Sequence, residues 1–461
     1  QQTQDQQEVW SRLPYGRHQT YQFIQKPIMI TGKADCGMQY GVKRSGSSVA
    51  YCALSIKCGT RDEEGYHSGI AHFVEHTIFK GTAKRSAAVI NGYLDRLGGE
   101  LNAFTTKEEI VFHATVLKED LNKAASLLFE LATSATFPEQ EIQTEKGVVI
   151  DEIHSYKDTP SEDIYDRFEE MLFKGHPLSG KILGTVASVK RITSEELRRF
   201  AAEKFLPEKM AFTVVADIDE KKMEKDVMKL VCKYFGNGCK GVAQDENIEH
   251  QSSGIQSDSK GTESHIPSGE GYFIPAAVPF DLTVNKRNHQ ANCIIGGLAP
   301  SLYQEKERLA TVLLCNILGG PATNSILNSV LREKNGWVYA VECGYTQFSD
   351  TGMVAISLGC DKDNLDKCLN AITKEIAKLQ NEPMSERRLK AAKKQLLGQL
   401  AISSDNGETQ CLSMGKGLIA YGKISGSKDN RALVDAITAE EVQKMAQTIF
   451  AKERLSKLTY I

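Results

Sequence analysis

The chain has 461 residues, a net charge of −3 at pH 7 and 41% hydrophobic residues. This length exceeds what one hydrophobic core usually organises, so two or more domains are expected. A slightly acidic balance argues against nucleic-acid and membrane-surface partners, since both favour a basic patch. The longest apolar runs, such as residues 49–56, are too short to span a bilayer, so no membrane insertion is expected.

Eleven cysteines are scattered along the chain without CxxC pairs. Several lie inside apolar runs, where a thiol behaves as a small hydrophobic side chain. Such a set is typical of a reducing compartment, so a cytoplasmic location is favoured. The chain begins with a Gln-rich segment and without Met, which keeps a processed or exported form as the alternative. Residues 1–20 are predicted to be a disordered tail.

The predicted elements begin near Tyr21, where apolar residues start to alternate with polar ones. Residues 49–56 are predicted to form a buried strand, and residues 70–79 a helix. Further strands are expected at 101–116 and 211–216. Further helices are expected at 87–97, 121–133, 139–156, 164–173 and 194–205. Because helices and strands come in mixed blocks, an α+β fold is favoured over a strictly alternating one.

The composition changes abruptly after residue 235. Residues 251–261 are mostly Ser, Gln and Gly, with almost nothing to bury. Residues 236–284 are therefore predicted to be a flexible linker, and a long functional loop is the alternative. This divides the chain into an N-terminal domain at 21–235 and a C-terminal domain at 285–461.

The second part of the chain repeats the first. The segment ITSEE at Ile192 is matched by ITAEE at Ile437, 245 positions later, and Pro138 and Pro383 have the same spacing. Two homologous mixed-sheet and helix repeats are the economical explanation.

The repeat predicts which half carries chemistry. The same spacing of 245 aligns Glu145 with Lys390 and Glu152 with Leu397. A structural role shared by both repeats would not explain the loss of two carboxylates. The N-terminal domain is therefore predicted to be the catalytic one, and the C-terminal domain to lack metal ligands.

A metal-binding pattern lies inside the helix predicted at 70–79. His72 and His76 in the segment HFVEH are one helical turn apart and so share a face. Two imidazoles so placed can bind one tetrahedral ion, while Glu75 can reach a water beside it as general base. The alternative is a helix with two partly exposed histidines and a solvated glutamate. A third protein ligand has to come from elsewhere in the chain.

The helix predicted at 139–156 offers that ligand. Its acidic residues include Glu145 and Glu152, which are seven positions apart and lie on one face. Alone, this pattern would indicate a solvated face. Beside HxxEH, it supplies the carboxylate that the metal chemistry lacks.

HFVEH, followed after seventy-five residues by Glu152 in the segment EKGVVIDE, resembles the insulinase/pitrilysin family of inverted (inverzincin) zinc peptidases. The resemblance runs from about Tyr21 to the end. The subunit size and the linker resemble the branch that includes mitochondrial processing peptidase and its small bacterial relatives. The resemblance implies one Zn²⁺ per chain held by His72, His76 and Glu152, with Glu75 as base and Glu145 hydrogen-bonded to a ligand imidazole. His154 is a rival ligand, but on a helix it points elsewhere.

The resemblance also implies substrate-binding residues. Residues 98–105 resemble the family's edge strand, on which a peptide adds as a further strand, so Asn102, Ala103 and Phe104 are expected to contact the scissile region. An ordinary internal strand is the alternative. Arg332 and Tyr339 resemble an Arg-x6-Tyr element, which implies that Arg332 holds a substrate carbonyl and Tyr339 stabilises the oxyanion.

One family feature is incomplete in this chain. The glycine-rich loop has only Gly319-Gly320, followed by Pro321, which leaves its role open.

The full-length relatives enclose a chamber with four repeats, so two repeats imply half of a clamshell. The expected molecule is a zinc metalloendopeptidase that cleaves short or unfolded peptides inside a homodimer, with Arg332 and Tyr339 completing the site of the other chain. The alternatives are a non-catalytic structural subunit and a helper subunit of a processing-peptidase-like complex. The intact HxxEH favours the enzyme.

Overall fold

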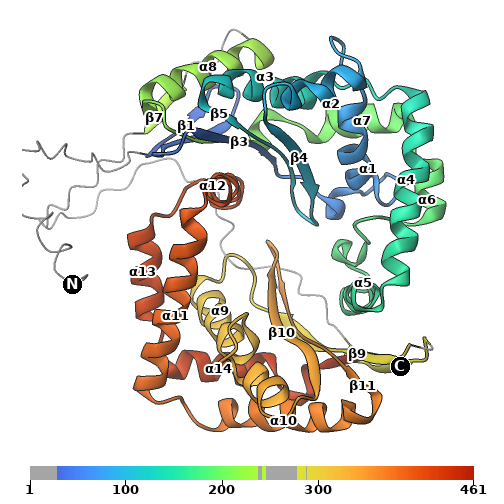
Figure 1. The fold of residues 1–461 in the computed structure, drawn as a ribbon, viewed down its shortest axis with the longest axis vertical. Coiled ribbons are helices and arrows are strands. Elements are labelled where there is room, and N and C mark those ends of the chain that lie inside the picture. Colours follow the sequence, from blue (N-terminus) through green and yellow to red (C-terminus); the bar gives the residue numbers. More distant parts are fainter. Residues whose placement is uncertain (1–28, 237–240, 245–277, 287) are drawn as a thin grey trace, which may run out of the picture.

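The computed structural model describes residues 29–236, 241–244, 278–286 and 288–461. It contains two mixed sheets, each with its own helices (Figure 1). The expected tail at 1–20 lies outside the described residues, as does most of the expected linker. Two short strands fall inside the linker range: β7 (Gly241–Gln244) pairs with the first sheet and β8 (Asp281–Val284) with the second.

The first sheet has the strand order β4-β5-β3-β6-β2-β1-β7, and among its pairs only β2 and β6 run parallel. Residues 101–116, predicted as one strand, instead form the hairpin β4–β5. The Thr106 hydroxyl closes its turn by accepting hydrogen bonds from the backbone N–H groups of Glu108 and Glu109 at 3.2 and 3.0 Å. The remaining bounds are β1 (Met29–Ala34), β2 (Gln39–Arg44), β3 (Val49–Ile56), β4 (Glu100–Thr105), β5 (Ile110–Leu117) and β6 (Met210–Ala216).

The second sheet has the order β10-β11-β9-β12-β8, which reproduces β4-β5-β3-β6-β2 strand for strand. Its parallel pair, β12 with β8, matches β6 with β2. The α+β fold with two homologous repeats is thereby confirmed. The bounds are β9 (Gln290–Ala299), β10 (Val338–Gln347), β11 (Gly352–Asp361) and β12 (Ser456–Tyr460).

The helices recur in part, since among the described residues the first half has eight and the second half six. The first half, defined as β1–β7 with α1–α8, contains α1 (Ile70–Thr77), α2 (Ala87–Asp95), α3 (Leu121–Ser134), α4 (Glu139–Asp158), α5 (Pro160–Leu172), α6 (Val186–Arg191), α7 (Ser194–Lys204) and α8 (Glu220–Phe235). The second half, defined as β8–β12 with α9–α14, contains α9 (Glu305–Gly319), α10 (Leu365–Asn381), α11 (Glu386–Asp405), α12 (Gly407–Tyr421), α13 (Ser427–Ala436) and α14 (Ala439–Ile449). None of the helices in the described part of the chain combines the length and apolar character that a membrane crossing requires.

The spacing of 245 residues does not hold throughout the repeat. Helices α7 and α14 do begin 245 positions apart, at Ser194 and Ala439. Helices α4 and α11, both of 20 residues, begin 247 positions apart, at Glu139 and Glu386, because two more residues separate Pro383 from its helix.

The longer spacing changes the residues that correspond. Glu145 aligns with the buried Ala392, not with the exposed Lys390, and Glu152 aligns with Gln399, not with Leu397. The absence of both carboxylates from the second half is unchanged.

Each half covers part of the other half's sheet with one helix (Figure 1). On α12, Cys411 and Met414 pack against Ala53, Val111 and Val215 of the first sheet. The Thr213 hydroxyl also donates a hydrogen bond to the carbonyl of Cys411 at 2.9 Å.

The reciprocal contact is made by α5. Phe168 packs with Leu458 and Tyr460 of the second sheet, and the Tyr460 hydroxyl donates to buried Asp163 at 2.7 Å. The two halves are therefore interlocked through exchanged helices.

A polar contact also joins the halves at the tip of the β10–β11 hairpin. Asp350 accepts from Arg61 at 2.7 Å and lies 3.1 Å from His176 Nε2. The backbone N–H of Ser349 donates to Glu108 at 3.0 Å. Although burial opposes ionisation of Asp350, its hydrogen bonds with Arg61 hold its pKa below the ordinary value.

Candidate metal centre

Helix α1 carries HxxEH and is held by its buried apolar face and by a cap at its N-terminus. Its apolar residues Ile70, Phe73 and Val74 are fully buried in the first core. It begins after Gly69, whose φ of 88° favours glycine and which has no side chain to cap the helix. Glu63 takes that role, accepting from the backbone N–H groups of Gly69 and Ala71 at 2.8 and 3.0 Å. Burial raises the pKa of Glu63 to about 8, although both hydrogen bonds favour its carboxylate.

The structure brings His72, His76 and Glu152 together. One donor atom from each lies within 4.8 Å of the others, and no other such group of three occurs among the described residues. Glu152 Oε2 is 3.3 Å from His76 Nε2 and 3.7 Å from His72 Nε2. This oxygen is buried and has no hydrogen-bond partner. A partnerless carboxylate oxygen facing two imidazole nitrogens fits a divalent cation with N and O ligands.

The electrostatics of the metal-free site favour the metal-binding protonation state for His72 and Glu152, whereas for His76 they favour the protonated ring. Burial lowers the pKa of His72, and neighbouring His76 lowers it further. The nearby imidazole of His76 lowers the pKa of Glu152, against the effect of burial, and His72 lowers it further. At neutral pH His72 is therefore neutral and Glu152 ionised, as metal binding requires. For His76, burial lowers the pKa, but Glu152 and Glu145 outweigh it and the net shift is upward.

Glu145 lies behind this cluster. It is 7% exposed, and its Oε1 is 3.1 Å from His76 Nδ1, so the ring donates from that nitrogen and turns Nε2 towards Glu152. Its other oxygen is 2.7 Å from Lys80 Nζ. The sequence reasoning missed Lys80, although its place four residues after His76 puts both on one face.

Glu75 lies on α1 between the two histidines and is largely buried. Burial raises its pKa, while the Thr105 hydroxyl and His76 lower it. Thr105 ends β4, so the predicted base lies beside the predicted substrate strand. The rival ligand His154 is exposed on α4 and is not part of the cluster.

Strand β4 forms one edge of the first sheet and pairs only with β5 among the described strands. Asn102 is exposed, and Ala103 and Phe104 are half-buried. Figure 1 shows β4 reaching from the sheet into the space between the halves. An unpaired edge of this kind can accept an extended peptide.

Arg332 and Tyr339 lie in the second half, on the π-helical turn η6 (Asn328–Glu333) and on β10. Tyr339 is 52% exposed, and the Arg332 side chain 54%. Both line a hollow of about 520 Å³ with Gly319 and Gly320. None of the four predicted zinc-site residues lines this hollow.

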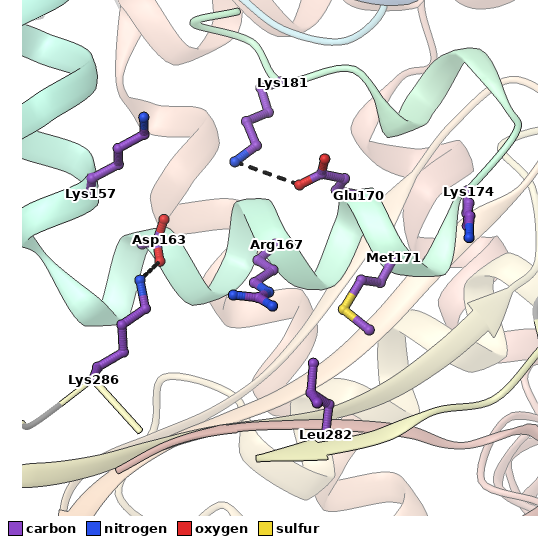
Figure 2. Close-up of a pocket in the computed structure, with 9 residues that line it drawn as sticks. All are labelled: Lys157, Asp163, Arg167, Glu170, Met171, Lys174, Lys181, Leu282 and Lys286. Atoms are coloured by element: carbon purple, nitrogen blue, oxygen red, sulfur yellow. Dashed lines mark hydrogen bonds and ion pairs between the residues drawn. The ribbon is translucent and has the colours of Figure 1, made fainter. Parts of the chain in front are cut away.

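A separate hollow of about 620 Å³ lies between α5 and β8 (Figure 2). Its two carboxylates are engaged: Asp163 is 2.9 Å from Lys286, and Glu170 is 3.6 Å from Lys181. Of the remaining cations, Lys157 extends from α4, Arg167 from α5 and Lys174 from the segment after α5 (Figure 2). None of the predicted site residues lines this hollow, which is distinct from the metal centre. Its basic residues are Lys157, Arg167, Lys174, Lys181 and Lys286.

Two family models match the chain. The model described as Insulinase (Peptidase family M16) matches residues 42–186, and the one described as Peptidase M16 inactive domain matches residues 191–396.

The chain is also similar to bacterial relatives. It is 28% identical over 416 residues to the uncharacterized zinc protease YmxG of Bacillus subtilis, covering 89% of this chain and 93% of that one. It is 28% identical over 400 residues to an uncharacterized zinc protease of Rickettsia felis, covering 86% and 89%.

Two solved structures share the fold. A protease from Helicobacter pylori matches with a TM-score of 0.80 at 19% identity, covering 94% of this chain and 99% of the other. A peptidase M16 inactive domain from Pseudomonas fluorescens matches with a TM-score of 0.79 at 16% identity, covering 94% and 97%. The two family models together with the repeated architecture show that the chain belongs to the insulinase family, peptidase family M16.

Proposed function

We propose that the chain is a zinc-dependent endopeptidase whose ion is held by His72, His76 and Glu152. The observation that carries this proposal is the partnerless, buried Oε2 of Glu152 facing two imidazole nitrogens. The donor set of two histidines and one glutamate is typical of catalytic zinc. Relatives along most of the chain are named zinc proteases, which supports the same assignment.

When bound, zinc would supply Lewis acidity, acidifying a water and polarising the scissile carbonyl. Glu75 accepts the proton of the attacking water, and burial brings its pKa closer to neutral pH, where a general base works best. Glu75 then returns the proton to the leaving amine. Glu145 keeps the His76 ring turned towards the ion through its Nδ1 hydrogen bond.

The substrate is a short or unfolded peptide that pairs with the edge of β4, with Asn102, Ala103 and Phe104 at the scissile region. Main-chain pairing binds extended segments with little dependence on sequence. Thr105, at the end of the same strand, lies next to Glu75, which brings the general base to this edge.

Arg332 and Tyr339 serve the zinc site of a second copy. Both are half-exposed and line a hollow that contains no zinc-site residue of their own chain. A homodimer with two-fold symmetry would supply each site once. In this arrangement Arg332 holds a substrate carbonyl and Tyr339 donates to the developing oxyanion.

The test compares the wild type with Glu75→Gln, with and without a chelator, by zinc content and by cleavage of a fluorogenic peptide library. One zinc in both proteins, with cleavage lost in the variant and under chelation, is expected. Removing the base should lower the rate by about 10²–10⁴-fold. Zinc without any cleavage would favour a non-catalytic subunit, and a wild type without zinc would refute the metal site.

A further inference from the structure

We propose that Lys80 is a positioning residue of the metal centre: its ammonium group holds Glu145 against His76 and so sets the affinity for zinc. This inference rests on the proposed function, since it concerns the same ion. It adds a residue that touches neither the ligands nor the substrate and acts only through Glu145.

The geometry is a short chain of three side chains. Glu145 bridges His76 and Lys80, with 3.1 Å from its Oε1 to His76 Nδ1 and 2.7 Å from its Oε2 to Lys80 Nζ. Glu145 is 7% exposed, and the side chain of Lys80 is 23% exposed. Water therefore reaches this carboxylate poorly, and the ion pair is screened less than a surface pair.

Lys80 lies in a segment whose backbone is fixed by contacts with neighbouring residues. It ends the 3-10 turn η2 (Ile78–Lys80), which follows α1 directly. The next residue, Gly81, accepts a hydrogen bond from the backbone N–H of Thr136 at 3.0 Å and forms a bridge with Ser86.

Gly81 also lies against the start of the helix that carries Glu145. A Cβ on Gly81 would lie 3.3 Å from Pro138 Cγ, and Pro138 is the residue directly before α4. The segment that carries Lys80 is thus held against the start of α4, the helix that carries Glu145.

The physical consequence concerns the orientation of one ring. A carboxylate that accepts from Nδ1 of a ligand histidine fixes the tautomer and aims Nε2 at the ion. A buried carboxylate whose second oxygen has lost its donor turns to find another, because an unsatisfied buried oxygen is costly. Removing the Lys80 ammonium therefore loosens the contact on which the His76 ring depends.

The experiment measures zinc affinity of the metal-free full chain by competition with a chromophoric chelator, which needs no catalytic activity. Lys80→Met should weaken zinc binding about tenfold, the lower end of the range for groups behind a ligand histidine. Lys80→Arg keeps the charge and the donors and should stay within about threefold of the wild type. Lys123→Met removes a surface ion pair of the same 2.7 Å length, with Asp120, and should leave zinc affinity unchanged.

A double-mutant cycle tests whether Lys80 acts through Glu145. Glu145→Gln should weaken zinc binding by about 10–100-fold, and adding Lys80→Met to it should weaken binding no further. The thermal midpoint of each metal-free variant shows that it is folded.

Wild-type zinc affinity in a folded Lys80→Met, an equal loss in Lys80→Arg, or additive losses in the cycle would overturn the role of Lys80 while leaving the zinc site standing. A wild type without zinc would overturn both.

Discussion

Helices α4 and α11 occupy equivalent places in the two halves, yet they bury different chemistry. Both have 20 residues, and Val149 of α4 matches Leu396 of α11 as a buried apolar contact. Where α4 buries the carboxylate of Glu145, α11 buries the methyl group of Ala392. The second half shows that this helix packs without a buried acid, so the fold does not require the buried carboxylate.

The helices after the first long strand differ in the same way. In the second half, α9 follows β9 with 15 residues and buries leucines such as Leu313, Leu314 and Leu318. In the first half, the shorter α1 follows β3 and places His72 among its buried residues. Burying polar groups opposes folding unless they are satisfied, and proteins usually break this rule at functional sites.

The largest effect is expected when α4 is given the residue that α11 has at the position equivalent to Glu152. Glu152→Gln copies Gln399 and removes the ionised ligand, so zinc affinity should fall by more than the roughly 100-fold that marks the loss of a supporting group. Peptide cleavage should fall with it. Equilibrium dialysis measures the zinc, and the reciprocal Gln399→Glu should leave the stoichiometry unchanged. Retained zinc in Glu152→Gln would show that another residue is the third ligand.

The next prediction asks whether the halves cooperate across a dimer. Tyr339→Phe alone should lower the rate by about 10²–10³-fold, as expected for one oxyanion donor. Mixed with Glu75→Gln, it should recover roughly a quarter of wild-type activity if the chains pair at random, since half of the dimers then have one intact site. The readout is peptide cleavage after co-refolding. Activity no higher than that of either variant alone would exclude the arrangement in trans.

The smallest expected effect concerns the polar contact between the halves. Asp350→Asn breaks a largely buried pair with Arg61 and should lower the free energy of unfolding by about 1–3 kcal/mol, less than for a fully buried pair. Because the folded pKa of Asp350 is below its ordinary value of 3.8, its contribution is present above that pH and is lost as the pH falls through the folded pKa.

Urea titrations from pH 7 down to pH 3 measure this contribution. The difference between wild type and Asp350→Asn should shrink towards the acid end. A difference that stays constant with pH would contradict the assignment. Asp217→Asn, which removes a surface pair with Lys118, is the matched control and should change stability little.

Much of this architecture could be predicted from the sequence, because periodicity and spacing are local signals. The HxxEH pattern predicted the helix α1 with both histidines on one face. The repeated segments at Ile192 and Ile437 predicted two domains with the same fold. The alignment of Glu145 with Lys390 was wrong, because two residues inserted after Pro383 leave no mark on the helical pattern. The turn at 106–109 was missed because Thr106 closes it without glycine or proline.

Other features had no readable signal. The pattern of an amphipathic helix does not indicate which sheet the helix will cover. The packing of α5 on the second sheet and of α12 on the first therefore could not be predicted. Lys80 stands four residues after His76, but lysines at that spacing are common on exposed helix faces. The cap from Glu63 depends on a loop that brings its carboxylate back to Gly69, which no local pattern describes.

The exchanged helices also dictate when the molecule can be completed during its synthesis. Strand β6 of the first sheet ends at Ala216. Helix α12 covers Ala53, Val111 and Val215 of that sheet, but it begins only at Gly407. An N-terminal fragment would present these apolar side chains to water and to neighbouring nascent chains. The half that carries the proposed metal ligands therefore keeps an exposed, aggregation-prone apolar surface until nearly the whole polypeptide has left the ribosome.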